Sequence, residues 1–351
     1  MKIRTGFILI IISFIFIRPS TYAQIGGDNT FEFLNLTNSA RIAAMGGNIL
    51  AIKDNDINLT LANPSLITKN MHNNLSLSFV DYYTDVNYGF ALYSRSFKEL
   101  GNFTAAMQFI DYGQFTYADE SGEQYGDFGV SEYAFNIGWG RPLDSLFSIG
   151  ANFKMIYSSL ESYTSFGIAV DVAGTYYNPK NKFCISLVGK NIGSQLKSYR
   201  SNNSEPLPFE IQLALSKKLE HVPFRYSLIL THLEKWDLTY DDPNDRSNID
   251  PLTNEEIPEN KLEDFADKVM RHIVIGGEFM PFKNFSVRFG YNYQRRKELK
   301  VDTRTSTVGF SWGIGFRIKK FQFNYSRATY HLVGSPNYIT ISTNLSDFIR
   351  K

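Results

Sequence analysis

The sequence predicts an all-β protein, a transmembrane antiparallel β-barrel of about 14 strands with an N-terminal plug in its lumen. Three observations lead to this fold class. The chain begins with an export signal, apolar and polar residues alternate with a period of two from about residue 75 onward, and the connections between these stretches are alternately short and long. Short turns on one rim and long loops on the other are typical of outer-membrane barrels.

Residues 1–23 are predicted to be a secretory signal peptide. Lys2 and Arg4 precede the apolar run GFILIIISFIFI, and the small residues Thr21 and Ala23 stand before the expected cleavage site. The run of about 12 residues is shorter than the roughly 20 that a membrane-spanning helix needs. No Cys follows the expected cleavage site, which argues against a lipoprotein anchor. We therefore expect export by the Sec route.

Composition narrows the classes of partner and site. Three of the 36 basic residues lie in the signal, which leaves 33 basic against 35 acidic residues in the exported chain. This balance offers no basic face for nucleic acid, so no nucleic-acid partner is predicted. The single Cys184 excludes an internal disulfide and a cysteine-based zinc site. The 29 Phe and 21 Tyr residues suit the aromatic girdles of a membrane barrel.

Residues 24–74 are predicted to form the plug segment, which precedes the strands. The stretch TNSARIAAMGGNILAIKDNDINLTLANPSLI combines small residues, a glycine pair and an Asn-Pro turn. A barrel of about 14 strands encloses more space than its inward side chains fill, whereas about eight strands can be filled by side chains alone. The glycines allow close backbone approach, and the charged residues are expected to meet a charged lumen wall. The residues that carry this prediction are Arg41, Gly46, Gly47, Asp54, Asn63 and Pro64, with Asp56 as a further charged contact.

Residues 75–351 are predicted to form the barrel. In TVGFSWGIGFRI, for example, Val308, Phe310 and Trp312 alternate with Gly309 and Ser311. Such alternation gives each strand one apolar and one polar face. The predicted strand spans are 75–80, 87–95, 102–111, 131–140, 146–158, 165–177, 182–191, 208–218, 223–233, 270–280, 284–295, 306–318, 321–327 and 338–345.

Alternation also assigns side chains to the lumen. It favours the lumen for Cys184, which shares a strand face with Ser186, and leaves contact with a neighbouring chain as the alternative. The other residues assigned inward are polar or charged, which argues against an apolar tunnel; they are Glu210, Gln212, Arg288, Asn292 and Arg317.

The connections are short after every second strand, as in RPLDS, NPKN and KK. The long ones are predicted to face outward as loops 112–129, 192–207 and 234–269, while the first and third outer connections are short. Soluble sandwiches and propellers also have alternating strands. The export signal, the sustained alternation of loop length and the Gly-, Ser-, Asn- and Gln-rich polar faces favour the membrane barrel.

No catalytic, cofactor or metal site is predicted, and the chain is not expected to be an enzyme. His232 with Asp237, and Asp81 with Asp85, lie near outer strand ends, but no local signature of a hydrolase surrounds them. The acidic loop 239–268 lacks the glycine of a calcium-binding EF-type loop. Its end, NKLEDFADKVM, is predicted to add a short helix with an apolar face.

At residues 26–67 the chain resembles the PorV/PorQ family, outer-membrane barrels of the type IX secretion system, with the closer likeness to the PorQ type. The later stretch YYTDVNYGFALYS supports the resemblance, and Ser65 departs from it where Ala is common. The more distant FadL-type transporters share an Asn-Pro-Ala-like element and a lumenal plug. The residues that carry the resemblance are Phe31-Glu32-Phe33-Leu34, Ser39-Ala40-Arg41, Ala43-Ala44-Met45-Gly46-Gly47, Asp54, Asp56 and Asn63-Pro64-Ser65-Leu66.

The resemblance implies a non-catalytic, FadL-like barrel in the outer membrane of a Gram-negative, Bacteroidetes-like cell. It implies partners in the cell-surface attachment complex: a PorZ-like protein that the outer loops hold, a sortase-like PorU and a PorV-like shuttle, beside outer-membrane lipid and lipopolysaccharide. Aromatic and acidic residues in the outer loops suit an interface. The predicted partner-binding residues are Tyr117, Tyr125, Phe128, Trp236, Asp241 and Asp242.

Two other functions remain open from the sequence. One is a FadL-like transporter of a hydrophobic small molecule, which the plug and the distant kinship favour. The other is a passive porin, which a plugged lumen disfavours.

Overall fold

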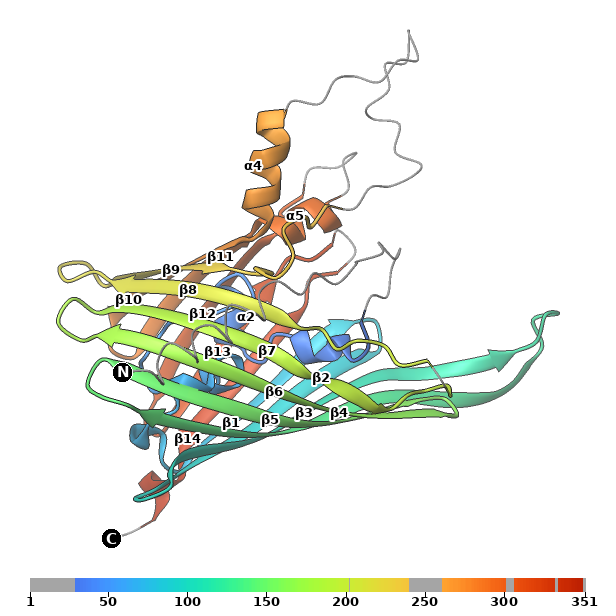
Figure 1. Cartoon of the computed structure of the whole chain (residues 1–351), viewed down its shortest axis with the longest axis horizontal. Coiled ribbons are helices and arrows are strands. Elements are labelled where there is room, and N and C mark those ends of the chain that lie inside the picture. Colours follow the sequence, from blue (N-terminus) through green and yellow to red (C-terminus); the bar gives the residue numbers. More distant parts are fainter. Residues whose placement is uncertain (1–28, 202, 240–260, 301–305, 332–333, 350–351) are drawn as a thin grey trace, which may run out of the picture.

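The computed structural model describes residues 29–201, 203–239, 261–300, 306–331 and 334–349. Fourteen antiparallel strands form one closed barrel, in which each strand pairs with its neighbours in sequence and β1 pairs with β14 (Figure 1). This confirms the predicted antiparallel barrel of 14 strands, and all fourteen predicted spans overlap a strand. The strands are β1 (Asn74–Tyr83), β2 (Val86–Phe97), β3 (Gly101–Ala118), β4 (Gln124–Pro142), β5 (Phe147–Leu160), β6 (Tyr163–Asn178), β7 (Phe183–Lys197), β8 (Glu210–Lys218), β9 (Phe224–Leu230), β10 (Ile273–Phe282), β11 (Phe285–Asn292), β12 (Phe310–Ile318), β13 (Phe321–Ala328) and β14 (Asn337–Asn344).

Short helices flank the barrel strands. Five lie before β1, two belong to long connections, and one follows β14. None of the described helices is long and apolar enough to cross a membrane. The helices are η1 (Glu32–Asn35), α2 (Ala40–Ala44), α3 (Leu59–Ala62), η2 (Pro64–Leu66), η3 (Lys69–Met71), α4 (Lys261–Arg271), α5 (Tyr293–Leu299) and η4 (Leu345–Phe348).

The two faces of the barrel wall have opposite polarity. Large apolar side chains such as Leu77, Phe289 and Trp312 point outward and are about half exposed. The polar residues between them, such as Arg288 and Ser311, point inward and are buried. An apolar outside and a polar inside are typical of barrels that lie in a lipid bilayer, and the opposite of a soluble sandwich.

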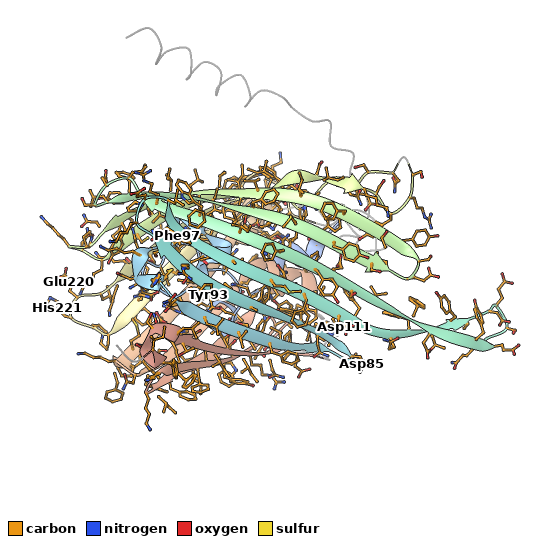
Figure 2. All side chains as sticks on the ribbon, turned by 90° about the horizontal axis from the view of Figure 1, so that it is seen from below. Asp85, Tyr93, Phe97, Asp111, Glu220 and His221 are labelled. Carbon is orange, nitrogen blue, oxygen red and sulfur yellow. The ribbon has the colours of Figure 1, made fainter. Side chains whose placement is uncertain are left out.

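The connections define two rims at opposite ends of the barrel. The short-turn rim holds the tight connections after even-numbered strands, and Glu220 and His221 mark it between β8 and β9 in Figure 2. The long-loop rim holds the connections after odd-numbered strands. Its first and third connections are tight turns at residues 84–85 and 161–162, as the sequence predicts.

Two predicted loop boundaries are wrong because regular pairing continues past the barrel wall. Most of loop 112–129 is strand: β3 and β4 stay paired as far as Ala118 and Gln124. Residues 113–129, called the arm below, project beyond the neighbouring strands (Figure 1). Similarly, the loop predicted at 192–207 begins only after Lys197, where β7 ends. Of loop 234–269, residues 240–260 lie outside the described residues, and α4 confirms the predicted helix.

The predicted strand 284–295 is also too long. It ends at Asn292, whose side chain accepts a hydrogen bond from Arg295 N and so caps α5. After α5, the backbone of Gly309 has a φ of 88°, which breaks the alternation expected of this stretch. Val308 is therefore fully buried, whereas Phe310 faces outward and is half exposed.

The N-terminal segment, residues 29–73, lies inside the barrel. Its helix α2 packs against β11, β12, β13 and β14, while η2 packs against β4, β5 and β6. These strands lie on opposite sides of the closed sheet, and the contacts are made to their inward residues. A segment that touches both sides from within must cross the lumen, and most of its side chains are buried.

Candidate functional site

Arg41 on α2 is the centre of a buried charge network between the N-terminal segment and the barrel wall. Its Nη2 lies 2.6 Å from Asp54 Oδ2 and 2.9 Å from Glu278 Oε2, and its Nη1 lies 3.0 Å from Asp56 Oδ2. Asp54 and Asp56 belong to the same segment, whereas Glu278 projects inward from β10. One guanidinium therefore joins two parts of the segment to the wall.

The wall supplies two more guanidinium groups to this network. Arg225 Nη1 on β9 lies 2.8 Å from Asp54 Oδ2 and 2.9 Å from Glu278 Oε2. Arg288 Nε on β11 lies 2.7 Å from Glu278 Oε1, and its Nη1 donates to Asn324 on β13. Three cations thus face three carboxylates, which compensates the cost of burying each charge.

The network shifts the pKa values of its lumenal members. Burial alone would raise the pKa of Asp54, but the charges of Arg41 and Arg225 lower it well below its usual range. Burial would likewise lower the pKa of Arg41, but Asp54, Glu278 and Asp56 raise it above its ordinary value. Both groups are therefore charged at any physiological pH, as the predicted contact with a charged wall requires.

The Asn63–Pro64 turn forms a second attachment, on the opposite side of the lumen. Asn63 Nδ2 donates to Leu50 O and to Thr175 Oγ1 on β6, while its Oδ1 accepts from Ser65 N. The turn reaches the wall where the wall lacks side chains: a Cβ added at Gly150 would lie 2.3 Å from the carbonyl carbon of Pro64. The backbone of the turn is therefore seated directly on β5.

The Gly46–Gly47 pair forms the third attachment. Both residues have a φ near 90°, a backbone conformation that is strained for residues with a side chain. A Cβ at Gly46 would lie 2.5 Å from Val274 Cγ1, and a Cβ on the facing wall residue Gly290 would lie 2.0 Å from Gly46 N. Together with the two attachments above, this places all six predicted plug residues against the wall or the long-loop rim.

Two cavities adjoin the N-terminal segment. One of about 290 Å³ lies toward the long-loop rim, and one of about 800 Å³ lies toward the short-turn rim. The segment contributes to the lining of both, and polar or charged residues dominate the two linings. The first is lined by Lys154, Lys190, Glu210, Gln212 and His232 among others, the second by Asp54, Lys218, Glu278, Lys283, Arg317 and Lys320 among others.

The inward face is not polar throughout, which the sequence analysis missed. Toward the long-loop rim, β1, β2 and β3 present buried apolar side chains inward, and Phe31, Phe33 and Leu34 of the N-terminal segment pack on them. Toward the short-turn rim the same strands present Ser, Thr and Asn. The sequence does contain the pattern that indicates this apolar wall, namely apolar residues at every second position of these strands. The apolar wall residues are Val80, Tyr88, Phe90, Leu92 and Ile110.

The histidine and aspartate residues that were considered for hydrolysis do not assemble. His232 lies 3.1 Å from Glu234 and 3.7 Å from Glu210, whereas Asp237 pairs with Lys268. Burial would lower the pKa of His232, but the two glutamates raise it above its usual value. Asp81 accepts a hydrogen bond from a β14 asparagine instead. In the described part of the chain, no group of three or more His, Cys, Asp or Glu side chains is arranged to hold a metal ion.

The predicted partner-binding residues lie at two places on the long-loop rim. Tyr117, Tyr125 and Phe128 stack on one another on the arm. Trp236 is more than half exposed and packs on His272 and on Phe265 of α4. Asp241 and Asp242 lie outside the described residues. Phe115, another loop aromatic, lies two residues before Tyr117 on the same face of the arm and stacks on Phe128.

The fold is that of known outer-membrane transporters. No family model matches the chain, and no curated protein matches its sequence. The Ralstonia pickettii toluene transporter TbuX overlays with a TM-score of 0.51 at 11% identity, covering 88% of this chain and 99% of that chain. The Pseudomonas putida toluene transporter TodX gives 0.51 at 12% identity, covering 88% and 96%. A Pseudomonas aeruginosa FadL homologue gives 0.46 at 9% identity, covering 88% and 98%.

At these identities the likeness shows the fold alone. The protein is an outer-membrane-type β-barrel, and its structural neighbours are transporters, not enzymes. The resemblance to the PorV/PorQ family stays a prediction.

Proposed function

We propose that this protein is a closed outer-membrane barrel that holds a protein partner at the cell surface through its long-loop rim. The observation that carries the proposal is the attachment of the lumenal segment by the Arg41 network, the Asn63 turn and the Gly46–Gly47 pair. A segment held on several sides of the lumen serves as a plug. Function then depends on the surfaces that the barrel presents.

The finer proposal follows the family resemblance. In it, the long-loop rim faces the cell exterior and holds a PorZ-like protein of the type IX secretion attachment complex, with PorU-like and PorV-like proteins as neighbours. Its support is the sequence pattern at residues 26–67 and the exposed aromatic residues of the rim, such as Tyr125 and Trp236. The secretory signal predicts export to that membrane.

The test of the anchor is deletion of residues 239–266, which removes the acidic connection and the first half of α4. We expect the barrel to remain folded in the outer membrane and the partner to be released, as measured by affinity purification and mass spectrometry from outer-membrane extract. The matched control removes the short β13–β14 connection. Undiminished recovery of the partner with the first deletion would show that this loop is not the anchor.

A second candidate is transport of a small hydrophobic molecule. It is favoured by the likeness to the toluene transporters and by the apolar inner wall beneath Phe31, Phe33 and Leu34. In this proposal the segment must leave the wall to open a path. The charged Arg41 network and the polar linings of both cavities oppose it.

Uptake decides between the two candidates. Proteoliposomes with the wild-type chain and with a Phe33→Ser variant are compared for entry of radiolabelled toluene. Transport predicts entry above that of empty liposomes and a changed rate in the variant. Toluene entry at the empty-liposome rate with both the wild type and the variant would reject transport. Together with partner release in the deletion above, this result would support the anchor function.

A further inference from the structure

The arm, residues 113–129, is a two-stranded ribbon that leaves the barrel wall. The pairing of β2 with β3 ends at Asn87–Asp111, and the pairing of β4 with β5 ends at Val130–Leu160. Beyond these points β3 and β4 pair only with each other. Figure 2 shows the ribbon projecting past Asp85 and Asp111, which mark the end of the wall.

One face of the arm is a ladder of four aromatic rings. The centroid distances are 5.4 Å for Phe115–Phe128, 4.7 Å for Phe128–Tyr117 and 5.6 Å for Tyr117–Tyr125. The two outer pairs are nearly parallel, with interplanar angles of 21° and 14°. Tyr125 is two-thirds exposed. A hydrogen bond from Tyr117 Oη to Glu161 on the next turn of the rim holds the ladder in place.

The charge of the arm is of one sign. It contains no Lys, Arg or His, and its acidic residues are Asp119, Glu120, Glu123 and Asp127. Within the described parts of the chain, none of these carboxylates forms an ion pair, and Glu161 beside the ladder forms none either. The arm thus combines the aromatic ladder with a net negative charge, and Glu161 is the carboxylate in direct contact with the ladder, through Tyr117.

The edges of the arm are less suited to recognition than its face. A register shift between Tyr117 and Ala118 and the left-handed backbone of Gly126 interrupt the ribbon. Such irregularities disfavour the addition of a further strand. A partner would therefore contact the aromatic side chains, not the backbone.

We propose that this face binds an arginine-bearing surface of a partner protein. A guanidinium is planar, stacks on tyrosine and phenylalanine rings, and is attracted by their negative faces. Glu161 beside the ladder and the acidic residues of the arm add complementary charge, which accelerates and orients association. The same charge repels the phosphate groups of lipopolysaccharide. The inference rests on the proposed anchor function and states the chemistry of its partner.

The test uses full-length protein in nanodiscs and two fluorescent probes of equal charge, nona-arginine and nona-lysine, whose binding is followed by anisotropy. We expect the arginine probe to bind about tenfold more tightly than the lysine probe, because only the guanidinium stacks. Binding of both should weaken as salt is raised.

Two arm variants separate the two contributions. In Tyr117→Ser with Tyr125→Ser, the preference for arginine should disappear while both probes still bind. In Glu120→Gln with Glu123→Gln, both probes should bind several-fold more weakly and depend less on salt. Glu205→Gln with Glu298→Gln, at other places on the same rim, is the matched control and should change neither property.

Several results would overturn the inference. They are equal binding of both probes to wild type, an equal loss in the control variant, or binding of a neutral oligosaccharide that competes with the arginine probe. Failure of the anchor function itself would instead show as full partner recovery in the 239–266 deletion. Partner release by that deletion but not by the arm variants would retain the anchor and reject the arm as its contact.

Discussion

Arg41 of the lumenal segment and Glu278 of β10 form a two-point ion pair inside the barrel. Arg41 Nε donates to Glu278 Oε1 at 3.2 Å, and Arg41 Nη2 donates to Glu278 Oε2 at 2.9 Å. The two residues are 237 positions apart in the sequence. This pair joins the beginning of the chain to its last third and makes the filling of the lumen a part of the folded barrel.

Replacement of Arg41 should destabilise the barrel strongly. Arg41→Met removes the arginine that pairs with Asp56 and leaves Asp54 and Glu278 with the wall arginines alone; removal of one partner from a buried charge network typically costs about 3–5 kcal/mol. The measurement is the urea unfolding midpoint in lipid vesicles. Arg317→Met at the exposed short-turn rim is the control and should change stability by less than about 0.5 kcal/mol. Equal effects of the two changes would show that the network does not hold the segment.

Close packing of the segment on the wall predicts a contrast between two strand glycines. A Cβ at Gly290 would lie 2.0 Å from Gly46 N, whereas one at Gly174 would meet nothing within 4 Å. We expect Gly290→Ala to cost about 1–3 kcal/mol by overpacking and to make the N-terminal segment more sensitive to protease. Gly174→Ala should be neutral in both measurements. A neutral Gly290→Ala would mean that the segment can move away without cost.

The filled lumen predicts electrical silence. Wild-type protein in planar bilayers should show no stable conductance, and deletion of residues 29–71 should produce it, because a barrel of about 14 strands is too wide for its own side chains to fill. Assembly of the deletion variant is checked by its heat-modifiable mobility in gels. Sustained conductance of the wild type at the level of the deletion would contradict a closed lumen.

Acid should release α4 from α5. Asp267 accepts hydrogen bonds from Tyr293 and Arg271 and pairs with Lys297. Burial would raise the pKa of Asp267, but these partners lower it to about 2. A depressed pKa means that the contribution is complete above the ordinary Asp pKa near 4 and is lost as the pH falls through about 2.

Hydrogen exchange of α4 checks this expectation. Protection should be constant from about pH 7 to pH 5 and fall only below the ordinary Asp pKa, whereas Asp267→Asn should reduce it already at neutral pH. Glu298→Gln, on the same helix α5, is the control. Unchanged protection in Asp267→Asn would show that other contacts hold the two helices together.

Cys184 provides a test of strand orientation. It is fully buried against Leu50 and Ala51 of the lumenal segment, which agrees with the inward face that alternation predicts. A maleimide reagent should therefore modify Cys184 only after unfolding. A cysteine introduced by Ser326→Cys, which also faces inward, should behave in the same way. Ile339→Cys, on the outward face, should react in detergent. Rapid modification of Cys184 in the folded protein would contradict its burial.

The sequence by itself determined the barrel and its two rims. Period-two alternation depends only on neighbouring residues, so the faces of strands such as β12 could be assigned from the chain alone. The same local chemistry of Gly46, Gly47, Asn63 and Pro64 indicated a compact segment before the strands. Strand ends were less well predicted, because the caps of Asn292 and the pairing of the arm depend on partners that are distant in sequence.

Only the tertiary structure decided which groups meet in the lumen. Arg41 could have paired with any inward carboxylate, and the choice of Glu278, with Arg225 and Arg288 on either side of it, follows from strand register and from where α2 packs. Likewise, four aromatic residues of the arm became a continuous ladder only when β3 and β4 paired. Contacts of this kind depend on closure of the sheet, because closure brings together residues that no local pattern relates.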